Sequence, residues 1–366
     1  MGKYVIKRIL ILIPIMLAVS FIVFSILYFT PADPARIMLG ASAPPEALEQ
    51  LREELGLNEP FLVQYGNYML GILHGDFGNS YRSGQPVFDE IFARFPVTLK
   101  LAGLSILVVT VFGILFGILS AVKQHSILDY TMTVLSMLAA SIPAFWLGLM
   151  MMLLFASHLG ILPSYGVEDG WRSYIMPVIA LSLPATAELT RMTRSAMLET
   201  IRQDYIRTAR AKGLMERAVI WRHALKNALM PIITVIGSNF GSLLGGSVVI
   251  ETVFSLPGLG SLIVTSIRTK DVPQVMAGTL FIALIFCIVL LIVDVAYAFI
   301  DPRVRTRYIK EKKIKTAKPD TTVLLAGAPA PEYKDAYLEA GVEDFIHVKA
   351  NCYDILSKIQ STKGVE

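Results

Sequence analysis

The sequence predicts an all-α membrane protein with six transmembrane helices, followed by a short α/β tail. Hydrophobic residues make up 54% of the chain and charged residues only 17%, whereas soluble domains carry more charge and fewer unbroken apolar stretches. Several stretches without any charged residue reach the roughly 20 apolar residues that a helix needs to cross the bilayer core. After about residue 318 the composition changes to that of an α/β segment.

Charge-free windows place the six helices in chain order. The first follows a basic N-terminus and is longer than the core of a secretory signal peptide, so we expect it to be retained. The fourth is the weakest, because it is short and contains Pro177 and Pro184; neighbouring helices and water can satisfy the backbone groups that these prolines leave free. The predicted spans are residues 9–30, 101–122, 130–157, 173–187, 227–250 and 272–293.

The loop charges predict the orientation of these helices. Residues 188–226 contain nine basic and four acidic residues, and residues 301–318 contain eight basic ones. Residues 31–100 instead contain nine acidic and five basic residues. Because Lys and Arg concentrate in cytoplasmic loops, both termini and the 188–226 loop are predicted to be cytoplasmic.

The 31–100 segment is predicted to lie outside the cytoplasm as an insertion after the first helix. It contains a helical stretch, PPEALEQLREELGL, that begins with proline. Two interpretations stay open for this segment, which is too long for a simple connection. It forms either a lid over the outer face of the bundle or a docking surface for an external partner.

Small residues and isolated charges are the notable features within the spans. The fifth span carries two overlapping GxxxG steps at Gly237, Gly241 and Gly245, which predict a close helix crossing either within the chain or between subunits. Glu188 and Glu251 lie near span ends, as does Asp294, so we expect solvated positions at the membrane interface. The chain has no row of acidic residues and no arginine ladder, which disfavours an ion-driven pump or a voltage sensor.

No pattern typical of a catalytic or metal site is present. The chain lacks a P-loop, an HExxH motif and a GxSxG motif. The five histidines are scattered singly, and the two cysteines form no CxxC pair. We therefore expect no enzyme activity, no metal and no cofactor bound by this chain. If the protein moves a solute against a gradient, the energy must come from elsewhere.

A basic segment, YIRTARAKGLMERAVIWRHALKNALMP at residues 205–231, separates two apolar parts of the chain. Its first part is an amphipathic helix that Gly213 is suited to end, and the next part is amphipathic and leads into the fifth span. The sequence thus predicts a helix–turn–helix at the inner membrane face. It is either an interfacial helix held by anionic lipid or a short helix presented to a cytoplasmic partner.

RTARAKG at residues 207–213, followed by HALKNALMP at 223–231, resembles the cytoplasmic EAA loop of ABC importer permeases. The chain keeps Ala209, Gly213 and Leu225 of that motif. It departs from the general motif, which has Glu, Ala, Ile and Pro in these places, at Arg207, Thr208, His223 and Lys226. These departures resemble the dipeptide/oligopeptide branch, as do TPADPARIMLG, GDFGNSYRSGQPV and VVIETVFSLPGLG. The resemblance covers residues 1 to about 307 and implies a type I importer permease fold.

The resemblance implies a permease subunit that translocates peptides or a similar small solute across a bacterial or archaeal cytoplasmic membrane. Its implied partners are a second, similar permease, two cytoplasmic ABC ATPase subunits that use ATP and Mg²⁺, and an extracytoplasmic solute-binding protein; no nucleic acid is implied. The binding protein would contact Pro257, Gly258 and Gly260. The implied ATPase-coupling residues are Arg207, Thr208, Ala209, Arg210, Ala211, Lys212, Gly213, His223, Leu225 and Pro231. The alternative function is a self-sufficient channel or an ion-coupled secondary transporter.

The tail differs from the rest of the chain. We divide the chain into a permease domain (residues 1–307, with the coupling loop at 188–226), a basic linker (308–319) and a partial α/β appendage (320–366). The appendage is predicted to have strands at 321–326 and 344–348 and helices at 332–340 and 352–360. It resembles the end of the cobalamin-binding domain of methylmalonyl-CoA mutase-type proteins, but it lacks the D-x-H-x-x-G motif. A fusion remnant, a docking appendage and a sensor half-domain stay open, and a cobalamin-linked enzyme subunit is a third functional hypothesis.

Overall fold

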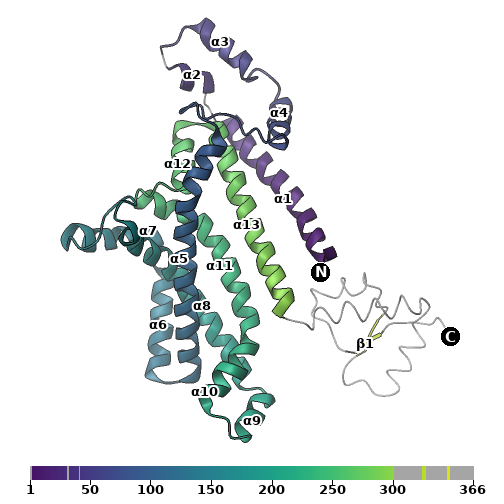
Figure 1. Cartoon of the computed structure of the whole chain (residues 1–366), viewed down its shortest axis with the longest axis vertical. Helices are drawn as coiled ribbons and strands as arrows, with labels where there is room; N and C mark the ends of the chain where they lie inside the picture. Colours follow the sequence, from purple (N-terminus) through teal and green to yellow (C-terminus); the bar gives the residue numbers. More distant parts are fainter. Residues whose placement is uncertain (1, 31–32, 41, 301–323, 327–343, 347–366) are drawn as a thin grey trace, which may run out of the picture. The chain divides into compact units, whose positions relative to one another are not determined.

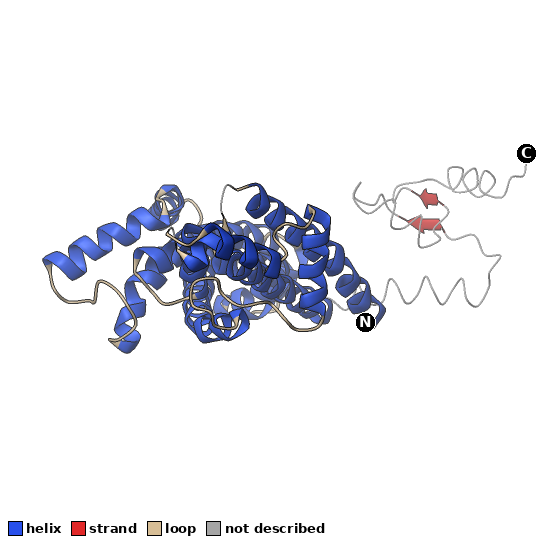
Figure 2. Cartoon of the chain, turned by 90° about the horizontal axis from the view of Figure 1, so that it is seen from above, coloured by secondary structure: helices blue, strands red, loops and turns tan. Residues whose placement is uncertain are grey.

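The computed structural model describes residues 2–30, 33–40, 42–300, 324–326 and 344–346 of the 366-residue chain. These residues belong to two units, residues 1–295 and 296–366. In the first unit the described residues form helices joined by loops (Figure 2). Figure 1 shows the short helices α9 (Asp204–Ala211) and α10 (Glu216–Ala218) at one end of this unit. At the opposite end lie α2 (Pro34–Leu39), α3 (Pro45–Glu54), α4 (Phe61–Leu73) and α12 (Leu259–Thr269). The predicted all-α architecture of this part of the chain is confirmed.

The long helices coincide with predicted spans, although their ends differ. They are α1 (Gly2–Phe29), α5 (Val87–Val122), α8 (Ile175–Ile201), α11 (Leu225–Val253) and α13 (Val272–Ile300). Four helical stretches among the described residues are long and apolar enough to cross a membrane, and five if a bent pair counts as one span.

Helix α5 begins fourteen residues before the predicted start of the second span, at Val87 instead of residue 101. Pro86 precedes the helix, and Asp89 and Glu90 lie in its first turn, where negative charge complements the helix dipole. The helix also continues through Pro96. The charges of this stretch hid it from a search for charge-free windows, so the helix is longer than the span predicted within it.

The third predicted span is not one continuous helix. It consists of α6 (Ile127–Ser141) and α7 (Ala144–Met151), and a π-helical turn (Met152–His158) extends α7. The two parts meet at an angle of 95°. The break is at Pro143, because proline has no N–H to donate and disfavours helical geometry in the residue before it; Ile142 is extended, with φ −83° and ψ 122°.

Helix α8 packs against α5, α6, α7 and α11. It runs on to Ile201, well past the predicted end at residue 187, and Pro184 lies inside it. A β-carbon at Gly113 or Gly117 of α5 would lie within 2.8 Å of α8 side chains, so these glycines let the two helices approach closely. A charge on α8 is also paired: Arg194 donates to both carboxylate oxygens of Asp129 on α6, at 2.7 and 2.8 Å.

The outer segment contains α2 (Pro34–Leu39), α3 (Pro45–Glu54) and α4 (Phe61–Leu73), and α3 is the helix that the sequence predicts after its proline start. Asp33 caps α2 and pairs with Arg52 of α3 at 2.6 Å. This guanidinium, through its hydrogen bond, lowers the pKa of the Asp33 carboxyl group. Tyr65 of α4 lies 2.8 Å from the hydroxyl of Ser20 on α1, which attaches this segment to the first long helix.

Beyond the end of α13, the second unit is described at β1 (Leu324–Ala326) and β2 (Asp344–Ile346). These strands pair in parallel, with Leu324 opposite Asp344 and Ala326 opposite Ile346. Parallel pairing of neighbouring strands requires a crossover between them, as the β–α–β–α prediction for the tail assumes. The predicted helices at 332–340 and 352–360 lie outside the described residues, as does His347.

Candidate functional site

Residues 202–224, here called the linking segment, join α8 to α11. The segment contains α9 (Asp204–Ala211), α10 (Glu216–Ala218) and a π-helical turn (Val219–Ala224) that continues into α11. Helix α9 ends before Gly213, which adopts φ 77° and whose N–H donates to the Arg210 carbonyl at 2.9 Å. A left-handed residue after a helix end favours glycine, so the predicted helix–turn–helix forms where the sequence placed it.

The inner face of α9 is held by apolar contacts within the chain. Ile206 is 0% exposed and Ala209 is 7% exposed. Both belong to the hydrophobic core that includes Val219, Ile220 and Ala224. Burying an isoleucine side chain contributes about 1.5–3 kcal/mol, so α9 is fixed to the body of the protein. Ala209 is thus packed against the rest of this chain, where it positions α9, and its contact with an ATPase stays a prediction.

The outer face of the linking segment exposes large apolar side chains. Met215 is 78% exposed, and Tyr205, Leu214 and Trp221 are each more than 40% exposed. A concentration of exposed apolar side chains of this kind is typical of a protein interface. Sequence reasoning missed these four residues, although they are the apolar residues of the segment that do not share the side of Ile206 and Ala209.

An ion pair closes the turn between α9 and α10. Arg210 donates through Nε and Nη2 to the two carboxylate oxygens of Glu216, at 3.1 and 2.6 Å. The pair is exposed, and pairs of this kind contribute about 0.2–1 kcal/mol. Arg210 is therefore engaged within the segment.

The remaining predicted coupling residues lie on both sides of the turn. Leu225 is half-buried against the core, and His223 is half-buried. Pro231 lies inside α11 and is exposed. The exposed members of the set near α9 are Arg207, Thr208, Ala211, Lys212 and Gly213.

At the other end of α11, the chain turns into α12 (Leu259–Thr269) around a buried carboxylate. Glu251 is 0% exposed. It accepts hydrogen bonds from the Thr98 hydroxyl at 2.7 Å and from the Ser261 N–H at 3.0 Å. The Thr98 hydroxyl in turn accepts from the Leu259 N–H at 2.8 Å. The prediction that Glu251 is solvated at the membrane interface is wrong: it ties the loop before α12 to α5.

The glycines of this loop are buried against the same carboxylate. A β-carbon at Gly258 would lie 2.4 Å from Cδ of Glu251, and one at Gly260 would lie 2.5 Å from Cα of Val248. Packing within this chain therefore leaves no room for a side chain at either position. Pro257 is half-buried, and contact of this loop with a binding protein stays a prediction.

The three glycines of the GxxxG steps in α11 differ in their surroundings. A β-carbon at Gly237 would lie 2.3 Å from Val293, and one at Gly241 would lie 2.5 Å from Phe286, both on α13. At Gly245 no atom lies within 4 Å of that position. The first two glycines thus serve a crossing of α11 and α13 within this chain, and Gly245 does not take part. The Asp294 side chain lies outside the described part of the chain.

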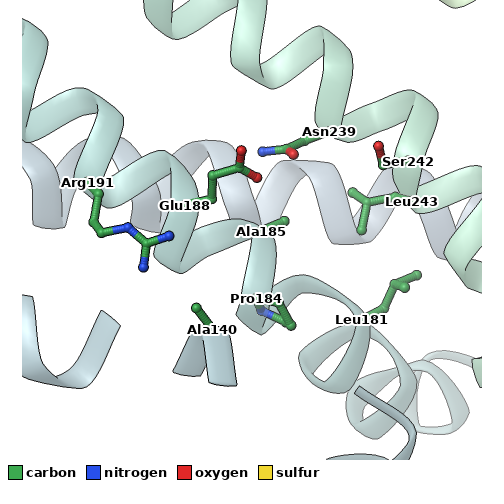
Figure 3. A pocket seen from close by; sticks show the side chains of 9 residues that line it. All are labelled: Ala140, Leu181, Pro184, Ala185, Glu188, Arg191, Asn239, Ser242 and Leu243. Carbon is green, nitrogen blue, oxygen red and sulfur yellow. The ribbon is translucent and has the colours of Figure 1, made fainter. Parts of the chain in front are cut away.

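A pocket opens between α8 and α11, beside α6 (Figure 3). Its volume is about 410 Å³. Glu188 was predicted near a span end, but it lies in the middle of α8 and lines this pocket. The described residues contain no group of three or more metal-ligating side chains that could hold a metal ion. The pocket is lined by Ala140, Leu181, Pro184, Ala185, Glu188, Arg191, Asn239, Ser242 and Leu243.

Comparison with known proteins identifies the family of this chain. The family model described as binding-protein-dependent transport system inner membrane component matches residues 113–306, and a model for the N-terminal part of such components matches residues 1–102. The chain belongs to this transport family. The permease is thus a multi-pass inner-membrane protein, and its family comprises transporter subunits, not enzymes, that work with ATPase and solute-binding partners.

Curated relatives match the permease over nearly their whole length. The dipeptide transport system permease protein DppB of Alkalihalophilus pseudofirmus is 40% identical over 332 residues, covering 83% of this chain and 100% of that protein. The glutathione transport system permease protein GsiC of Salmonella choleraesuis is 42% identical over 305 residues, covering 83% and 99%. Among solved structures, inward-facing MetNI methionine ABC transporter matches with a TM-score of 0.48 and 19% identity over 58% of this chain and 96% of that chain.

Proposed function

We propose that this permease carries peptides or a chemically similar small solute across the cytoplasmic membrane as part of an ATP-driven importer. The relatives that support this substrate class transport dipeptides and glutathione. ATP and Mg²⁺ would be bound by two ATPase subunits, and a second permease and a solute-binding protein would complete the importer. Both termini and the linking segment would face the cytoplasm, as the loop charges indicate.

The linking segment is our candidate for the ATPase contact. The observation that carries this assignment is its construction: one face is fixed in the core by Ile206 and Ala209, while Met215 and its apolar neighbours stay exposed. Both ends of the segment are continuous with long helices, α8 and α11. A displacement of the segment by closing ATPases would therefore move α8 and α11 as rigid bodies.

Uptake into proteoliposomes tests the proposed function directly. We expect accumulation of a labelled dipeptide only when the permease pair, the ATPases, the binding protein and ATP are all present. Uptake by the permease alone, driven by an ion gradient without ATP, would contradict the proposal and favour a secondary transporter.

A pair of equally exposed residues tests the coupling contact. Met215 in the linking segment and Leu73 at the end of α4 are both 78% exposed. We expect Met215→Asp to weaken retention of the ATPases on the purified permease at least about tenfold, because a charge placed in an apolar contact removes its burial energy. Leu73→Asp is the matched control and should leave ATPase retention unchanged. Equal retention by both variants would exclude Met215 from the contact.

A further inference from the structure

The pocket between α8 and α11 carries polar groups that the fold does not use. Glu188 and Arg191 are exposed on α8, one turn apart. No ion pair joins either of them to another described residue, and the polar contact of Arg191 is a 3.5 Å hydrogen bond to the Ser136 carbonyl. Charged side chains are costly where a helix surface meets lipid, so an exposed pair on α8, just beyond the fourth predicted span, indicates a pathway or a ligand site.

The opposite wall of the pocket, from α11, contains a second pair at the same spacing. Asn239 is only 6% exposed, and its Nδ2 atom is buried without a hydrogen-bond partner. Ser242 lies one turn further along the helix. Figure 3 shows the Asn239 amide and the Glu188 carboxylate facing one another across the pocket. A buried amide without a partner costs about 1–3 kcal/mol, which a bound polar ligand would recover.

We propose that this pocket binds a small zwitterion with a free ammonium and a free carboxylate group, such as an unblocked dipeptide, during its passage through the permease. Glu188 would accept from the ammonium group and Arg191 would donate to the carboxylate, where a guanidinium can form two parallel hydrogen bonds. Asn239 and Ser242 would hydrogen-bond the peptide group between them, and Leu181 and Leu243 supply apolar walls. This inference rests on the proposed peptide substrate.

The chemistry of free peptides fits such a pocket. An α-carboxyl group has a pKa of about 3.3–3.7 and an α-amino group about 7.7–8.0, so both ends are charged at neutral pH. Moving two charges into a membrane without partners is strongly unfavourable. An acid and a base one helical turn apart, neither neutralised by the other, would compensate both charges of one small solute.

Protection from alkylation measures this binding without depending on transport. We would introduce Ser242→Cys into a full-length chain carrying Cys287→Ser and Cys352→Ser, assemble the complete importer in vesicles, and follow alkylation of the new thiol. At ten times its dissociation constant, dialanine should slow alkylation about tenfold. Dialanine capped at both ends by acetyl and amide groups should give almost no protection.

Neutral variants of Glu188 and Arg191 then test which end of the ligand each side chain binds. We expect Glu188→Gln to weaken dialanine binding about tenfold and to remove the preference over N-acetyl-dialanine. Arg191→Gln should instead remove the preference over dialanine amide, and the exposed control Lys123→Gln, in the loop after α5, should change neither. A merely structural role of these charges would alter all ligands alike.

Two results would overturn the inference. In the first, dialanine gives no protection from alkylation. In the second, the capped peptide protects as well as dialanine does, and the Glu188→Gln and Arg191→Gln variants are protected as well as the unmodified pocket. The outcome for the proposed function is separate, since it depends on ATP-dependent dipeptide uptake by the unmodified importer. Protection without uptake would support the binding pocket and contradict the proposal that a dipeptide is the transported substrate. Uptake without protection would preserve the importer and reject the pocket.

Discussion

The linking segment and the loop before α12 lie at opposite ends of α11, and the resemblance to importer permeases predicts a partner contact for each. In the linking segment, apolar contacts of Ile206 and Ala209 hold α9, and the outer face stays exposed. In the loop before α12, a fully buried carboxylate organises the backbone, and its glycines are buried against it. Small residues thus mark a turn between exposed elements in one place and a buried polar centre in the other.

Because of this difference, we expect a substitution to cost more stability in the loop before α12 than in the linking segment. Buried hydrogen bonds to Glu251 have no water to replace them, so their loss leaves donors unsatisfied. The turn at Gly213 is exposed to solvent, where water replaces lost hydrogen bonds at small cost. Four substitutions test this contrast.

The largest effect is expected from Glu251→Ala. Removing the carboxylate leaves the Thr98 hydroxyl and the Ser261 N–H without their acceptor and creates a cavity, which should lower the free energy of unfolding by about 2–5 kcal/mol. Thermal or denaturant unfolding of the purified permease measures this change. The exposed residue Glu199 on α8 gives a control, and a loss no greater for Glu251→Ala than for Glu199→Ala would refute the buried network.

Gly258→Ala should have the next largest effect. Its β-carbon would overlap Cδ of Glu251, and such overpacking costs about 1–3 kcal/mol of unfolding free energy. Gly245→Ala in α11 is the matched control, because its β-carbon meets open space and alanine favours a helix by about 0.5–1 kcal/mol. Unfolding midpoints should therefore shift in opposite directions, and equal shifts would contradict the packing described for the loop.

Gly213→Ala should have a smaller, local effect. At φ 77° a β-carbon costs about 1–2 kcal/mol, and the turn after α9 should open more often. Limited proteolysis of the linking segment would detect this as faster cleavage. Gly213→Pro should be worse, since proline cannot reach this φ and loses the N–H bonded to Arg210; we expect it to abolish uptake while the protein stays in the membrane. Normal uptake by Gly213→Pro would show that the turn geometry does not matter.

The smallest effect is expected from Arg210→Gln. Loss of an exposed ion pair with Glu216 should change stability by about 0.2–1 kcal/mol, and the difference from the unmodified protein should shrink as salt is added. Proteolysis of the segment at low and high salt would measure it. A large, salt-independent loss would mean that the pair is desolvated in the assembled importer.

Much of the fold could be predicted because a membrane-spanning helix consists of a contiguous stretch of apolar residues. The first and last spans lack charge, and GxxxG steps indicated close crossings that Gly237 and Gly241 make with α13. Pro143 was visible as well, but a charge-free window does not show that a proline turns the chain by 95°. Helices α5 and α8 extend beyond the spans predicted for them, because Lys100 and Glu188 ended the charge-free windows.

The site was predicted less completely. The helix–turn–helix and its glycine follow from local sequence, since φ and helix capping depend on neighbouring residues. Which residues of the segment stay exposed does not, and neither the burial of Ala209 nor the exposure of Met215 was predicted. Glu251 was placed in solvent because it lies near the end of a predicted span. Its partners Thr98 and Ser261 come from separate helices, so the sequence does not show the contact.

The sequence by itself determined that this chain is a helical membrane protein, where its basic loops lie and where its helix-ending glycine belongs, because hydropathy, charge and backbone preference are local properties. Only the tertiary structure decided that Ala209 points inward, that Glu251 is a buried tie, and that Glu188 and Asn239 face one pocket. Burial and hydrogen bonding between distant residues depend on how helices pack, and residues 98 and 251, or 188 and 239, become neighbours only when α5, α8 and α11 come together.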